Sequence, residues 1–142
     1  MDWNYLFTSF NGRLNRKPYW IAAILLMVAG IALQALVALM MGPLAGLAVG
    51  IVFLYPSFAL TVKRAHDRNR PAWLVGAFFG LMILITLLTP PDIENTNDAP
   101  SPLFLGAAIV WLAMSLFFLV DLGFLRGTAG PNRYGPDPLD GK

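Results

Sequence analysis

The sequence contains no cysteine, only one histidine and few charges, since 13% of its 142 residues are Asp, Glu, Lys or Arg. The lack of cysteine excludes disulfides, thiolate metal ligands and a cysteine nucleophile. A single histidine cannot complete a typical zinc site or a bis-histidine haem site. No glycine-rich segment ends in the Lys-Ser/Thr pair of a phosphate-binding loop. We therefore expect no metal, no cofactor and no catalytic residue, and a protein that is not an enzyme.

Apolar residues are correspondingly abundant, at 57% of the chain, and the mean hydropathy is +0.63. Soluble domains are about 45–50% apolar and about 25% charged. A chain this short cannot bury so large an excess of apolar surface by folding in water. The composition therefore predicts that lipid, rather than water, surrounds much of the protein.

Four apolar stretches are candidates for membrane spans, at about residues 19–41, 44–62, 72–89 and 103–125. About 20 apolar residues are needed to cross a hydrocarbon core of about 30 Å. Between the stretches lie a Gly-Pro turn, a basic connector and a proline-rich linker at residues 90–102. The sequence predicts an all-α integral membrane bundle of four transmembrane helices, forming a single domain over residues 1–142.

The basic residues are distributed on one side of these predicted spans. All ten Lys and Arg precede the first span, connect the second to the third, or follow the fourth. The opposite loops contain only the acidic residues Asp92, Glu94 and Asp98. Positive charge in short loops marks the cytoplasmic side. We expect both termini in the cytoplasm (N-in, C-in), with residues 126–142 as a cytoplasmic tail, and we expect no binding of nucleic acid.

A shorter apolar pattern precedes the first span. Trp3, Leu6, Phe7 and Phe10 follow helical spacing within residues 1–12, with polar residues between them. This pattern is typical of an amphipathic helix in the membrane interface. Such a helix could simply anchor the first span, or it could present a docking surface for a partner.

Glycines also recur at four-residue intervals in the second and third spans. Gly42, Gly46 and Gly50 form one series, and Gly76 and Gly80 form another. Small residues at this spacing let transmembrane helices approach closely. The pattern favours packing within the bundle, and an oligomer interface is the alternative.

Three polar segments, at residues 10–20, 63–73 and 127–138, carry motifs that resemble those of the DUF805 family. The matching residues are Phe10, Gly12, Arg13, Arg16, Tyr19, Trp20, Arg64, His66, Asp67, Trp73, Gly130, Asn132, Arg133, Tyr134, Gly135, Asp137 and Pro138. Lys63 departs from the pattern, since the family usually has Arg there. The resemblance covers the whole chain and implies a multi-pass protein of the bacterial inner (cytoplasmic) membrane, without an established activity.

These three segments are expected to meet at the cytoplasmic ends of the helices as one polar cluster. Asp121 is expensive in lipid unless it is paired, and we expect Arg64 or Arg16 to pair with it. The cluster could be an ion-pair network that fixes the helix ends, or a site for phosphate headgroups. Its predicted members are Arg13, Arg16, Arg64, His66, Asp67, Arg68, Asp121, Asn132, Arg133, Tyr134 and Asp137.

The leading functional hypothesis is a non-enzymatic membrane protein. It would act as an accessory or interaction subunit, or as a binder of anionic lipid at its cytoplasmic face. Its expected partners are anionic headgroups, a second copy of the chain, or another membrane protein. The alternative is an enzyme or carrier that acts on a lipid-linked phosphate through His66 and Asp67.

Overall fold

The computed structural model describes residues 2–88 and 101–140, and every regular element in these two ranges is helical. Three helices are long and apolar enough to cross a membrane: α2 (Arg16–Met41), α3 (Pro43–Asp67) and the last helix, Pro102–Phe124. A fourth helix, α4 (Ala72–Leu88), is equally apolar but has only 17 residues. The helical membrane bundle expected from the sequence is thus confirmed, whereas most of the predicted proline-rich linker lies outside the described residues.

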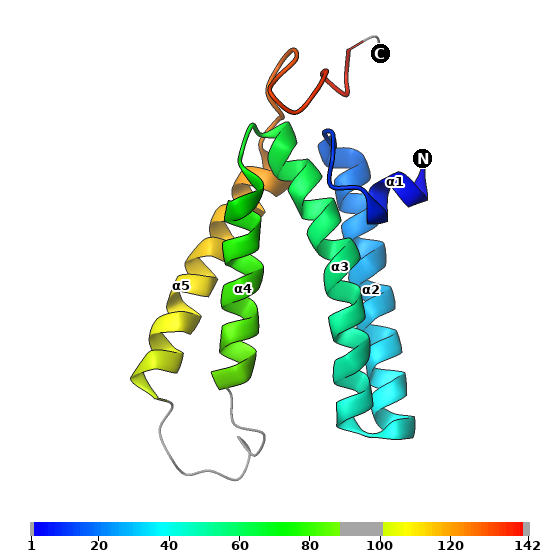
Figure 1. Ribbon diagram of the computed structural model, residues 1–142, viewed down its shortest axis with the longest axis vertical. Coiled ribbons are helices and arrows are strands. Elements are labelled where there is room, and N and C mark those ends of the chain that lie inside the picture. Colours follow the sequence, from blue (N-terminus) through cyan, green and yellow to red (C-terminus); the bar gives the residue numbers. More distant parts are fainter. Residues whose placement is uncertain (1, 89–100, 141–142) are drawn as a thin grey trace.

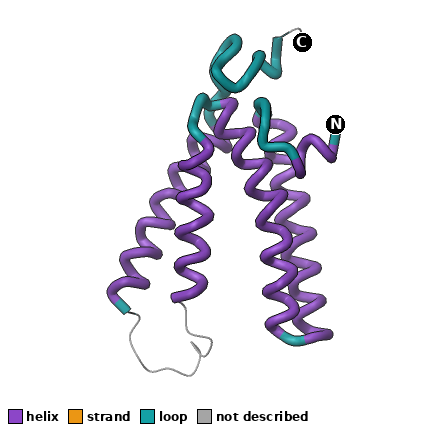
Figure 2. The backbone as a smooth tube through the Cα atoms, in the orientation of Figure 1, coloured by secondary structure: helices purple, strands orange, loops and turns teal. Residues whose placement is uncertain are grey.

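The long helices are arranged as two antiparallel pairs (Figure 1). Helices α2 and α3 form one pair, and α4 and α5 (Pro102–Phe118) form the other. The pairs meet where the chain begins and ends, and they separate towards the opposite end (Figures 1 and 2). We call the meeting point the basic end, formed by residues 9–20, 63–73 and 119–140.

The ends of these helices are set by local chemistry. Asn15 caps α2 by accepting a hydrogen bond from the Arg16 backbone N–H at 2.7 Å. The helix begins at Arg16, three residues before the start predicted at residue 19. Gly42, at a φ of +94°, makes the tight turn into α3, which Pro43 begins. A φ of this sign favours glycine, and proline is well tolerated at a first helical position. The predicted Gly-Pro turn is confirmed.

Buried apolar residues form two small cores near the basic end. One joins α3, α4 and the end of the last helix around Val62, Val75 and Leu122. The other joins α1, α2 and α3 around Leu6 and Leu60. Most of the remaining helix surface is apolar and exposed, as is expected where lipid is the surrounding solvent.

Only one of the two predicted glycine series lies at a close helix contact. A Cβ atom on Gly46 would lie 2.6 Å from Ala38 Cβ, so α2 and α3 approach closely there. At Gly76 and Gly80, an added Cβ would meet nothing within 4 Å. The prediction that this second series packs helices together is wrong, because α4 turns those glycines towards open space.

The N-terminal helix α1 (Trp3–Thr8) is shorter than the predicted residues 1–12. The Asp2 side chain caps it by accepting a hydrogen bond from the Tyr5 backbone N–H at 3.1 Å. Leu6 is buried in the second core, while Trp3 is 47% exposed. The face of α1 that carries Leu6 therefore packs on the bundle, whereas Trp3 at its first position stays half exposed.

Candidate functional site

The end of the last helix is held by side chains from the other helices. Its final six residues form a π-helical turn, η1 (Leu119–Phe124). A helix end leaves about four carbonyls without backbone partners, and lipid cannot satisfy them. Arg64 Nε and Nη2 donate to Leu122 O and Leu125 O, both at 2.6 Å. Trp20 Nε1 donates to Gly123 O at 2.9 Å.

Lys63 likewise donates hydrogen bonds to backbone carbonyls, in this case those of α1 and of the residue that follows it. Its Nζ donates to the carbonyls of Tyr5, Leu6 and Ser9 at 2.5, 2.7 and 2.6 Å, and its side chain is fully buried. An ammonium group has three donors and no acceptor, which matches three converging carbonyls. Lys63 therefore fastens α1 to the bundle instead of pairing with its helical neighbour Asp67.

Asp67 is the acceptor at the centre of the basic end. Arg13 Nε donates to its Oδ1 at 3.1 Å, and Arg64 Nη1 donates to its Oδ2. Both ion pairs are buried, so they are poorly screened by salt. These cations leave little of the carboxylate free for acid–base chemistry.

The tail folds back over the helix ends, as the sequence predicts. The Arg13 guanidinium donates to Thr128 O at 2.6 Å, to Gly130 O at 2.7 Å and to Gly135 O at 3.3 Å. The Thr128 backbone N–H donates in turn to Asp67 O at 2.9 Å. All three donor groups of Arg13 are therefore used within the protein.

His66 is also tied to the tail. Its Nδ1 lies 3.3 Å from Gly12 O, and its ring stacks on that of Tyr134 with centroids 3.8 Å apart. Asn132 Nδ2 donates to the His66 carbonyl at 2.9 Å. No hydroxyl in the described part of the chain hydrogen-bonds to the imidazole. These contacts explain His66 as a packing residue and give it no nucleophile to activate.

Asp137 and Arg133 complete the tail. The Asp137 carboxylate accepts from the backbone N–H groups of Leu139 and Gly130, each at 3.0 Å. These hydrogen bonds, the one from Leu139 foremost, hold the pKa of Asp137 below its ordinary value. Arg133 Nη2 donates to Asn69 O at 3.2 Å but is otherwise exposed. The tail is thus shaped by its own turns as well as by Arg13.

Asp121 is paired, but not with the residues expected from the sequence. It accepts from Arg68 Nη2 at 2.9 Å and from Arg70 Nη2 at 3.3 Å, and its side chain is 5% exposed. The predicted partners Arg64 and Arg16 are wrong. Arg64 is occupied by carbonyls and Asp67, and the loop after α3 brings its own two arginines over η1.

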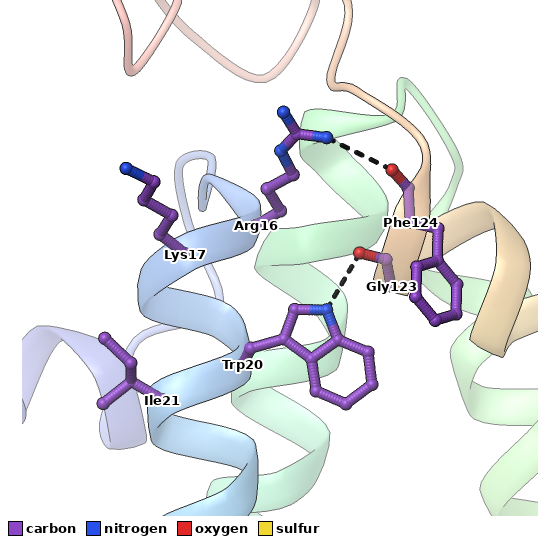
Figure 3. A pocket seen from close by; sticks show the side chains of 6 residues that line it. All are labelled: Arg16, Lys17, Trp20, Ile21, Gly123 and Phe124. Carbon is purple, nitrogen blue, oxygen red and sulfur yellow. Dashed lines mark hydrogen bonds between the residues drawn. The ribbon is translucent and has the colours of Figure 1, made fainter.

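A groove opens beside this cluster, between α2 and η1, with a volume of about 410 Å³. Figure 3 shows two cationic side chains on one side and an indole and a phenyl ring below them. Arg16 makes one long hydrogen bond, 3.4 Å to Phe124 O, and Lys17 makes none with the described residues. The groove is lined by Arg16, Lys17, Trp20, Ile21, Gly123 and Phe124.

Trp20 fixes the floor of this groove. A Cβ on Gly123 would lie 2.8 Å from Trp20 Cζ2, so glycine is needed for the edge of the indole to come this close to η1. Lys17 was missed as a site residue from the sequence. The signal for it is a basic pair one turn before an aromatic residue at the start of a span, the usual pattern at a membrane interface.

The predicted cluster thus separates into parts. One set shares hydrogen bonds or ring contacts around Asp67 and the tail: Arg13, Arg64, His66, Asp67, Asn132, Tyr134 and Asp137. Arg68 and Asp121 form a separate ion pair, Arg16 lies in the groove, and Arg133 lies at the tail surface. No group of three potential metal ligands occurs within residues 2–88 and 101–140. Anion binding by any of these residues stays a prediction.

Comparisons with known proteins agree with the geometry of a membrane bundle. The chain is 34% identical to "Uncharacterized protein YiiR" of Escherichia coli (strain K12), covering 94% of this chain and 88% of that protein. It is 29% identical to the inner membrane protein YhaI (95% and 90% covered) and 29% identical to YhaH (97% of both), from the same organism. No solved structure matches. A sequence profile described as "Protein of unknown function (DUF805)" matches residues 7–136, so the chain belongs to the DUF805 family and is a multi-pass inner-membrane protein.

Proposed function

We propose that this chain is a non-enzymatic membrane protein that binds the phosphate headgroup of an anionic phospholipid in the groove between α2 and η1. One observation carries the proposal. Arg16 and Lys17 form no ion pair with a described carboxylate, and they border a groove whose other lining is mostly apolar. Cationic side chains can bind the phosphate of a lipid headgroup, while the aromatic rings below them contact the start of its acyl chains.

The proposal includes an orientation in which the basic end faces the cytoplasm. Every Lys and Arg of residues 2–88 and 101–140 belongs to the segments that meet there, whereas the α2–α3 turn has none. Anionic lipids in the cytoplasmic leaflet attract such residues by about 1 kcal/mol each. Both termini would then be cytoplasmic, with all four helices spanning the membrane as a single domain and residues 126–142 as its tail.

Helix α1 fits the same picture as an interfacial element. Lys63 fixes it against α3, and Trp3 and Phe7 stack with centroids 5.8 Å apart. Trp3 remains half exposed. Aromatic rings are favoured at the boundary between headgroups and hydrocarbon. We propose that α1 lies in this boundary and orients the α2–α3 pair.

The buried arginines of the basic end are poorer candidates for the headgroup. Arg13 and Arg64 are buried and already donate to carbonyls and to Asp67. A phosphate would have to displace these bonds and leave buried carbonyls unpaired, which costs about 1–3 kcal/mol each. The free cations of the groove carry no such penalty.

Native mass spectrometry in detergent with added phosphatidylglycerol or phosphatidylcholine tests this function. The variant Arg16→Gln/Lys17→Gln removes both groove cations. At about 1 kcal/mol per cation, the retention of phosphatidylglycerol should fall about 30-fold. The variant Arg126→Gln/Arg133→Gln removes the same charge from exposed positions outside the groove and should retain the lipid as the wild type does. Equal losses in both variants would show only a general effect of charge.

A further inference from the structure

The membrane-spanning part of the chain contains one amide side chain, Gln34 on α2. It is exposed, and no hydrogen bond joins its amide to any residue in the described ranges. Three hydroxyl side chains of the spans each donate to a carbonyl four residues earlier on their own helix. These are Thr61, Thr86 and Ser115, at 2.7, 3.0 and 2.8 Å. The exposed Gln34 amide offers unpaired donors and an unpaired acceptor to the surroundings of these helices, whereas Trp111 Nε1, which also lacks a partner in the described ranges, is buried.

The amide opens onto a groove of about 500 Å³ between the two helix pairs. Helix α3 forms its floor, and α2 and α4 form its sides. A Cβ on Gly50 would lie 3.1 Å from Gln34 Oε1, so this glycine leaves the amide its space. The groove is lined by Gln34, Leu47, Gly50, Ile51, Leu54, Met82, Ile83, Thr86 and Leu87.

The depth of Gln34 restricts what can satisfy it. Seven residues separate it from the end of α2 at Met41, or about 10 Å along the helix axis. This places the amide within the hydrocarbon core, where neither water nor acyl chains supply a hydrogen-bonding group. A partner must therefore bring its own polar group to the same depth.

We infer that the partner is a second copy of this chain, which packs against this groove and pairs its own Gln34 with the first. A two-fold axis along the membrane normal brings each Gln34 to the same depth without further adjustment. A side-chain amide both donates and accepts, so two of them satisfy one another. Ile51 and Leu87 are 60% and 77% exposed and add apolar contact at this surface.

Hydrogen bonds of this kind between transmembrane helices are modest, so the effect on association is expected to be moderate. Gln34→Leu keeps the size of the side chain and removes the amide. It should weaken dimerisation about tenfold, while Gln34→Asn should keep part of the affinity. Thr86→Val is the matched control in the same groove, because the Thr86 hydroxyl already bonds to Met82 O.

The measurement is energy transfer between labelled copies in phosphatidylcholine vesicles, over a series of protein-to-lipid ratios. The chain has no cysteine, so Asp140→Cys gives a unique site for the dye on the full-length protein. The absence of anionic lipid separates this test from the headgroup proposal. We expect energy transfer in the wild type and in Thr86→Val, and about tenfold weaker association in Gln34→Leu. A monomeric wild type, or equal association in Gln34→Leu, would overturn the inference.

Discussion

Replacing Arg64 should destabilise the protein more than replacing any exposed cation. The side chain is fully buried, and it bonds to Leu122 O and Leu125 O, each at 2.6 Å, as well as to Asp67. Arg64→Met preserves the apolar length of the side chain and removes all of these donors. The two carbonyls and one carboxylate oxygen are then left without this partner inside the protein.

The magnitude follows from these lost contacts. A buried carbonyl without a partner costs about 1–3 kcal/mol, and removing one member of a buried ion pair costs about 3–5 kcal/mol. Arg13 remains bound to Asp67, and the penalties overlap, so the sum is smaller than its parts. We expect Arg64→Met to lower the free energy of unfolding by about 3–5 kcal/mol, a large share of the about 5–15 kcal/mol of a typical domain.

Unfolding by SDS in mixed micelles, followed by circular dichroism, measures this change. The matched control is Arg126→Met, which removes the same charge at an exposed position. The Arg126 guanidinium donates no hydrogen bond within the described ranges, so this control should lie within about 0.5 kcal/mol of the wild type. If Arg64→Met unfolds with the same free energy as the control, Arg64 does not hold the helix ends together.

Three further predictions concern α1, the tail and the orientation. Lys63→Met should release α1 and increase hydrogen exchange in residues 3–8. The carbonyls that lose the Lys63 ammonium as a donor should lower the free energy of unfolding by about 1–3 kcal/mol. Unchanged exchange would contradict the role of Lys63. The pKa of Asp137 in the folded protein lies below its ordinary value of 3.8. The stabilisation of the tail by the ionised carboxylate is therefore complete above pH 3.8 and is lost as the pH falls through the lower folded pKa. Exchange of the Gly130 amide should therefore rise only at such acidic pH in the wild type, and should not follow this titration in Asp137→Asn. Finally, a single cysteine at Met41, which is 75% exposed next to the α2–α3 turn, should react with an impermeant maleimide added outside intact cells, and one at Asn11 should not. The reverse pattern would contradict the proposed orientation.

The architecture follows from features that the sequence shows directly. Long apolar runs need lipid, and the one-sided basic residues identify the helix ends that meet. The pairing of Asp67 with several cations was also predictable, because it lies among arginines on a helix that continues past Val62. The positions of the motifs and of the basic residues relative to the apolar runs therefore predicted at which helix ends the polar residues gather.

The choice of partners inside the cluster was not predictable. Arg64 binds carbonyls of the last helix, and Lys63 binds carbonyls of α1. A backbone carbonyl has no signature in the sequence, so neither contact could be read from it. Asp121 was assigned to the wrong arginines for a related reason, since the sequence does not show how the chain turns after α3, where Asn69 adopts a left-handed φ of +56°.

We propose that the basic end uses its buried arginines to hold the helix ends and the tail in place, and its groove cations to bind lipid. A crystal structure grown from a lipidic mesophase doped with phosphatidylglycerol tests this division most directly. We predict a phosphate within hydrogen-bond distance of Arg16 and Lys17, with Arg13 and Arg64 still bonded to the carbonyls described above. A phosphate bound by Arg13 or Arg64, with the groove between α2 and η1 unoccupied, would contradict it.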